Sequence, residues 1–378
     1  MDMNQDRLGY YLVGDKKFYS KTLALLESYS QRPSNLTWVF NDSVYSSIDW
    51  QTPIYESLPE LYLRRALQLR NQYDYLVLYY SGGADSGNIL KTFINNNIFL
   101  DEIVMQLPES ARKNFNDRDK SNGNIYSELE FSAKPVLEKY RNKLHPNTLI
   151  RYQDISKPIF DLFEKDNWFE TNPMGTNISI AGIARQAAQV AETHILDLCY
   201  KGLKTAQIVG VDKPLVHFDG RNYYAYFLDV NAMHSPPVDL TKNEIFYNLY
   251  QTEFFYWTPD MPEIVVKQAQ EIKKVCEVSE YHRNMMLKSF VKHISEFRPV
   301  LHNIIYPNNI EVPWDPEKPN SKILRPMDNW FWHQASAKIK NNYLDVIKYI
   351  KENTDPGKMI DDDIQNGISG HRSIMYKL

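Results

Sequence analysis

The stretch Tyr75–Ser86, which reads YLVLYYSGGADS, decides the fold of this chain. Its first six residues are apolar or aromatic without a polar break, as expected of a strand covered by helices on both faces. The run stops at the serine and two glycines of positions 81–83, and a helical pattern follows over about Ser86–Asn96. Strand, glycine-rich turn and helix in this order indicate one β–α unit of a parallel sheet.

Three further strands are predicted downstream, at Phe99–Gln106, Thr148–Asp154 and Ala206–Val211. Helical patterns near Ile125–Arg141 and at Ile178–Leu203 separate them. Strands that alternate with helices at this spacing form parallel sheets with helices on both faces. We therefore predict an α/β fold with a doubly wound parallel sheet.

Three regions are predicted along the chain: a small α/β lead-in at 1–70, a parallel-sheet domain at 71–230 and a mainly helical cap or substrate region at 231–378. Within the lead-in, residues 8–13 and 36–40 read as strands, and Leu58–Arg70 is amphipathic at helical spacing. The helical patterns of the last region cover Lys242–Tyr250, Pro262–Val278, Arg283–Phe297 and Ser336–Asn353.

Composition excludes several classes of protein. The chain has 378 residues, and its 43 Lys+Arg against 47 Asp+Glu give a net charge of −4, so only a local patch could attract nucleic acid. Cys199 and Cys276 are its two cysteines and lie 77 positions apart, which excludes disulfide frameworks and zinc ribbons and disfavours thiol chemistry. Without a secretory h-region or a run of 18 apolar residues, we expect a cytoplasmic protein with no membrane partner.

The loop after the first buried strand has the residues that an anion site needs. Two glycines let the backbone bend so that successive N–H groups converge at a helix N-terminus, where the helix dipole also favours negative charge. The hydroxyls of Ser81 and Ser86 add donors, whereas Asp85 suits Mg²⁺ that bridges phosphates rather than the phosphates themselves. The alternative is a plain strand-to-helix turn in which Asp85 stabilises the first helical turn.

This serine, glycine and aspartate pattern resembles the PP-loop of the N-type ATP pyrophosphatases, a superfamily that includes asparagine synthetase, argininosuccinate synthetase, GMP synthetase and NAD synthetase. These enzymes cleave ATP between the α and β phosphates and attach AMP to a substrate oxygen. The resemblance implies ATP and Mg²⁺ as cofactors and Asp85 as catalytic residue and magnesium ligand. It implies that the pyrophosphate together with its Mg²⁺ is held by Ser81, Gly82, Gly83, Ala84, Asp85 and Ser86, and that the adenine lies near Tyr80, Met105 and Gln106.

A second, shorter match covers Ile208–Lys213, which is similar to a segment at the end of a later strand in asparagine synthetase. It implies Asp212 as a second magnesium ligand and Lys213 as a cation that neutralises the α-phosphate in the transition state, both catalytic. The match is incomplete, because asparagine synthetase has an acidic residue after this aspartate and this chain has Lys213 and Pro214. For Lys213 the alternative is a solvated cation in a turn.

The function expected first is therefore an AMP-forming synthetase that resembles asparagine synthetase and joins a nitrogen to an adenylated small-molecule acceptor. Position 2 is Asp2, and no cysteine precedes Cys199, so we expect no built-in glutaminase with an N-terminal cysteine. Nitrogen would come from ammonia, an amine or a separate glutaminase. Two alternatives stay open: an enzyme of the same superfamily that modifies tRNA or a nucleobase, and a nucleotide-binding protein without turnover.

Several weaker candidates have structural alternatives. The loop Pro108–Asn124, with Arg112, Lys113, Arg118 and Lys120, is either a lid over the nucleotide or a solvated loop. Asn172–Asn177 is more simply a helix cap than an anion site. The predicted strand Tyr223–Val230 is flanked by His217, Asp219, Arg221 and Asp229. A histidine near a carboxylate there could take a proton from an attacking amine, and hairpin turn residues explain this set equally well. The basic end, with His371, Arg372 and Lys377, is more simply a frayed terminus than a contact to phosphates.

Overall fold

The computed structural model describes residues 6–31, 35–114, 118, 125–171, 180, 193–210, 213–229, 244–287, 300–306, 326–354 and 371–378. Within these ranges a five-stranded, all-parallel sheet forms the centre of an α/β fold. Its strands run in the order β10-β7-β4-β5-β6. Their bounds are β4 Tyr75–Tyr79, β5 Glu102–Leu107, β6 Leu149–Asp154, β7 Thr205–Val209 and β10 Tyr250–Phe254. Four of them confirm predicted strands within three residues at each end.

Helices cover both faces of this sheet, because alternate residues along its strands pack into two different hydrophobic clusters. Leu76, Leu78 and Ile103 belong to the main core, which includes α4 (Leu58–Gln72), α5 (Ala84–Asn95) and α13 (Glu263–Val278). Val77 and Val104 pack instead on the other face, against α10 (Thr193–Tyr200) and α12 (Glu244–Leu249). Successive strand side chains point to opposite faces. The continuous apolar run of β4 therefore reflects burial on both sides, as predicted.

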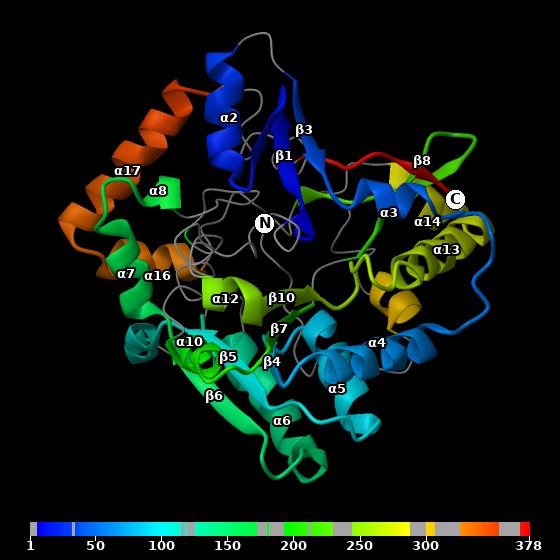
Figure 1. The fold of residues 1–378 in the computed structure, drawn as a ribbon, viewed down its shortest axis with the longest axis horizontal. Coiled ribbons are helices and arrows are strands. Elements are labelled where there is room, and N and C mark those ends of the chain that lie inside the picture. Colours follow the sequence, from blue (N-terminus) through cyan, green and yellow to red (C-terminus); the bar gives the residue numbers. More distant parts are fainter. Residues whose placement is uncertain are drawn as a thin grey trace.

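The remaining helices lie around the sheet and beside the smaller strands (Figure 1). They are α2 Lys21–Ser30, α3 Asp42–Ser46, the 3-10 helix η1 Glu109–Asn114, the π-helix η2 Leu129–Ala133, α6 Lys134–Tyr140, the 3-10 helix η3 Arg141–Lys143, α7 Ser156–Phe163, α8 Trp168–Thr171, α14 Glu280–Leu287, α16 Pro326–Gln334 and α17 Ala337–Glu352. None of the helices in the described ranges is both long and apolar enough to cross a membrane.

Two antiparallel sheets of three strands accompany the central one. The first has the order β2-β1-β3, with β1 Tyr10–Val13, β2 Lys16–Phe18 and β3 Leu36–Val39, and packs with α2 at the top of Figure 1. The second has the order β11-β9-β8, with β8 Leu215–Phe218, β9 Tyr223–Tyr226 and β11 Tyr376–Lys377. The β8–β9 pair is a hairpin, so Asp219 and Arg221 are turn residues there.

The three predicted regions all contribute to the main core. Strand β10 comes from the region predicted to be mainly helical, yet it pairs with β7 in the central sheet. Helix α4 comes from the lead-in and packs with α5 and α13. Buried residues from Leu8 to Leu378 belong to one hydrophobic cluster. Of the predicted helix Ile178–Leu203, the described part is Ile180 and 193–203, where α10 lies.

Candidate functional site

The carboxyl ends of β4 and β7 meet at the centre of the sheet, where the strand order reverses. From β4 the chain continues to β5 and β6 on one side, and β7 and β10 lie on the other side. In open α/β sheets such a switch point leaves a crevice outside the strand ends where ligands bind. The loop Ser81–Ser86 follows β4, and Gly210 and Lys213 follow β7. The topology thus brings the two sequence matches to one place.

Gly82 gives this loop its shape. Its φ of +86° lies in the left-handed region that favours glycine. A Cβ at this position would also lie 2.7 Å from the backbone nitrogen of Ala133 at the end of η2. The Ser132 hydroxyl donates a hydrogen bond of 2.6 Å to the Gly82 carbonyl. The loop is therefore held from outside by η2 and needs a glycine at its bend.

The N-terminus of α5 presents backbone donors beside this bend. Gly83 is its N-cap residue, and no side chain forms a capping hydrogen bond there. The two loop serines bind to each other instead, with 3.2 Å between their hydroxyl oxygens, and the Gly83 N–H donates to the Ser81 hydroxyl at 3.3 Å. A helix start without a side-chain cap favours an anion, because its first N–H groups and the helix dipole both attract negative charge.

Asp85 lies in the first turn of α5 and forms an ion pair with Lys213. The Lys213 ammonium is 2.7 Å from one carboxylate oxygen and 2.8 Å from the other. Burial by itself raises the pKa of Asp85, but the Lys213 charge and hydrogen bonds from Lys213 and Tyr306 outweigh it and lower the pKa below its ordinary value. At neutral pH Asp85 is therefore a carboxylate and not a protonated acid.

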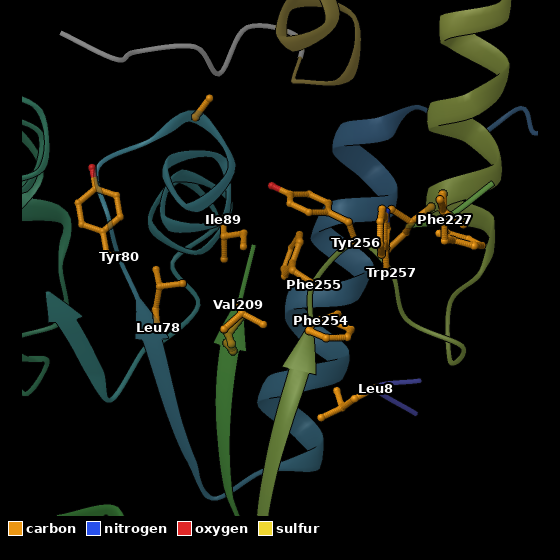
Figure 2. Close-up of a cluster of buried hydrophobic side chains, with 14 of the residues drawn as sticks. Leu8, Leu78, Tyr80, Ile89, Val209, Phe227, Phe254, Phe255, Tyr256 and Trp257 are labelled. Carbon is orange, nitrogen blue, oxygen red and sulfur yellow. The ribbon is translucent and has the colours of Figure 1, made fainter. Parts of the chain in front are cut away.

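Gly210 permits the close approach of β7 to α5. A Cβ at Gly210 would be 3.2 Å from the Asp85 Cβ and equally close to the Ile89 side chain. Figure 2 shows Ile89 of α5 above Val209, the last residue of β7. Because position 210 carries no side chain, Lys213, three residues further on, can reach Asp85.

Aromatic residues far along the chain complete the surroundings of Asp85. The Tyr306 hydroxyl donates to the Asp85 carboxylate, and the Tyr256 hydroxyl donates to its backbone carbonyl at 2.9 Å. Asn88, one turn further along α5, donates to the Tyr256 hydroxyl at 2.9 Å. Figure 2 shows the Tyr256 hydroxyl pointing toward α5. Asp85 is thus fixed at both its side chain and its backbone.

The three residues expected near the adenine lie at the ends of β4 and β5. Tyr80 and Met105 are only 2% exposed and belong to the main core. Gln106 is partly exposed, and its amide donates to Gln153 at the end of β6, at 2.6 Å. Of the three, Gln106 therefore has the side chain that a ligand at the surface could reach most easily. Adenine binding at these residues stays a prediction.

Other sequence candidates take structural roles or lie outside the described residues. Asp212 lies outside them, as do Lys120 and residues 172–177, so the second magnesium ligand stays a prediction. In η1, Arg112 forms an ion pair with Glu109 and lies over the Tyr126 ring. Asp229 is buried and forms an ion pair of 2.7 Å with the buried Lys21.

The donor set around Asp85 fits a magnesium ion that arrives with a nucleotide. Mg²⁺ is commonly held by one or two carboxylates together with phosphate oxygens and waters. Asp85 is a hard oxygen donor, 31% exposed at its side chain, and it already neutralises a cation. Within the described ranges no three His, Cys, Asp or Glu side chains gather into a site that could hold a metal alone. Asp85 and phosphate oxygens would have to share the ion.

The sequence did not identify Tyr306, Tyr256 or Ser132 as parts of this site. They come from segments without any motif, and only the fold brings them to the loop.

Comparison with known proteins does not assign this chain to a family: no protein-family model matches it, and no curated protein matches it.

Proposed function

We propose that this protein is an AMP-forming, ATP-dependent synthetase with the doubly wound nucleotide-binding fold of the PP-loop ATP pyrophosphatases. The observation that carries the proposal is the position of the Ser81–Ser86 loop. It joins β4 to an α5 N-terminus without a side-chain cap, at the switch point of a parallel sheet, with Lys213 opposite. An anion with an associated cation suits this place better than a neutral ligand does.

In the proposed reaction, the pyrophosphate end of ATP binds at the backbone N–H groups of the loop and the hydroxyls of Ser81 and Ser86. A substrate carboxylate or carbonyl oxygen attacks the α-phosphorus. The bond from the α-phosphorus to the bridging oxygen breaks, and its electron pair leaves with pyrophosphate. Ammonia or an amine then displaces AMP, loses a proton and gives an amide or a related C–N product. Such catalysis is mainly positioning and electrostatic stabilisation.

Lys213 and Asp85 have distinct parts in this scheme. The Lys213 ammonium moves from the Asp85 carboxylate to the charge that develops on the α-phosphate. Asp85 would hold Mg²⁺, which would supply charge that neutralises the phosphates. The ion pair between Lys213 and Asp85 holds both side chains beside the loop.

The test is incubation with ATP, Mg²⁺ and pools of amino acids and carboxylates, with and without ammonium. We expect AMP and pyrophosphate; ADP and phosphate would reject the proposal. Binding of ATP with Mg²⁺, followed by tryptophan fluorescence, does not depend on finding the acceptor, and its absence would also reject the proposal.

Two lysine variants locate the chemistry. Lys213→Met is expected to slow AMP formation by about 10²- to 10³-fold, as loss of one transition-state contact does. Lys157→Met is the matched control, because it also breaks a lysine–carboxylate pair, with Asp161, but on the exposed face of α7. Equal turnover in the two variants would remove Lys213 from the mechanism.

A further inference from the structure

The segment 300–306 lies against Asp85, although it is more than 200 residues away in the sequence. Its Tyr306 is 1% exposed and donates its hydroxyl hydrogen to one Asp85 carboxylate oxygen. Tyr256 packs on the Tyr306 ring at 5.5 Å between centroids, and its own hydroxyl holds the Asp85 backbone. A buried tyrosine from the C-terminal region therefore fixes the orientation of the candidate magnesium carboxylate.

The chemistry of Tyr306 suits orientation rather than neutralisation. The Tyr306 hydroxyl is a neutral, buried donor, and its hydrogen bond goes to a carboxylate oxygen of Asp85. A neutral donor leaves the carboxylate its negative charge. Lys213, in contrast, cancels that charge while it is paired. If Lys213 leaves for a phosphate, Tyr306 still holds Asp85 in place.

We propose that Tyr306 is a positioning residue that holds the Asp85 carboxylate in the orientation that binds Mg²⁺ with ATP. The inference rests on the proposed function, because it concerns the same site. It adds that residues 300–306, which carry no recognisable motif, set the affinity of the loop for the metal–nucleotide pair.

Tyr62 offers a matched control. It is 2% exposed, and its ring centroid lies 6.3 Å from that of Tyr306. Its hydroxyl donates to the Ile305 backbone carbonyl at 2.6 Å and accepts from Gln268, so it anchors the same segment without a hydrogen bond to Asp85. Tyr62→Phe removes a buried hydroxyl next to residues 300–306, and Tyr306→Phe removes a buried hydroxyl within them. Only Tyr306→Phe removes the donor to the carboxylate.

The experiment measures the Mg²⁺ concentration that gives half-maximal binding of a non-hydrolysable ATP analogue, by tryptophan fluorescence, with urea unfolding of each variant alongside. We expect Tyr306→Phe to raise this concentration about tenfold, the size of one hydrogen bond to a charged group. Tyr62→Phe should change it less than twofold at a similar loss of stability. Equal shifts in both variants, or none in Tyr306→Phe, would overturn the inference.

Two further measurements distinguish failure of this inference from failure of the proposed function. If the wild-type protein does not bind the analogue with Mg²⁺, the proposed function itself fails. If Tyr306→Phe does not fold, Tyr256→Phe takes its place, because it removes the donor to the Asp85 backbone carbonyl. That variant should raise the half-maximal Mg²⁺ concentration at least threefold, and a value equal to that of Tyr62→Phe would overturn the inference.

Discussion

Replacing Gly82 by alanine tests whether the bend of the loop is set by the fold. At φ +86° the left-handed backbone conformation destabilises a residue with a Cβ by about 1–2 kcal/mol. The new Cβ would also lie 2.7 Å from the Ala133 nitrogen and 2.9 Å from its Cβ, and such overpacking costs about 1–3 kcal/mol. We expect the free energy of unfolding to fall by about 2–5 kcal/mol, a large part of a typical total of about 5–15 kcal/mol.

The matched control is Gly87→Ala, five residues later inside α5. A Cβ at Gly87 would meet no atom within 4 Å. Alanine there should stabilise the helix by about 0.5–1 kcal/mol, because glycine loses more backbone entropy on folding. The same substitution is therefore expected to have opposite effects at two glycines of one loop–helix unit.

The assay is urea unfolding followed by tryptophan fluorescence, with the midpoint and the slope compared between variants. Gly82→Ala should lower the midpoint at an unchanged slope and weaken ATP binding, whereas Gly87→Ala should raise the midpoint. A Gly82→Ala protein as stable as the wild type would refute the assigned loop conformation and its contact with η2.

Two other predictions concern titratable groups. Because the folded state lowers the pKa of Asp85, the stability that its ionised form contributes is complete above about pH 5 and is lost as the pH falls below about 4. The unfolding free energies of wild type and Asp85→Asn should accordingly converge as the pH falls below about 4, and a difference independent of pH would contradict the ion pair. Burial raises the pKa of the Cys276 thiol to about 12 and that of Cys199 above its ordinary value. A thiol reagent at pH 8 should therefore modify neither cysteine in the native protein and both in urea, and rapid reaction of a native thiol would contradict their burial.

The sequence predicted the central part of the fold because that part is locally encoded. Apolar runs bounded by turn signals identified β4, β5 and β7, and the amphipathic pattern identified α4. The strand β10 was not predicted, since its sequence YQTEF contains polar residues that are buried in the sheet. One of them, Glu253, is 2% exposed and forms an ion pair with the buried Arg65 of α4. Buried polar residues that are paired in this way interrupt the apolar pattern by which a buried strand is predicted.

By itself the sequence determined that a glycine loop joins a buried strand to a helix with Asp85 in its first turn, because backbone conformation and helix start depend on neighbouring residues. Only the tertiary structure decided what faces that aspartate. Lys213 and Tyr306 reach it from 128 and 221 residues away, through the strand order of the sheet and the packing of residues 300–306. Side-chain contacts at such separations depend on how the elements pack, which no local pattern of residues records.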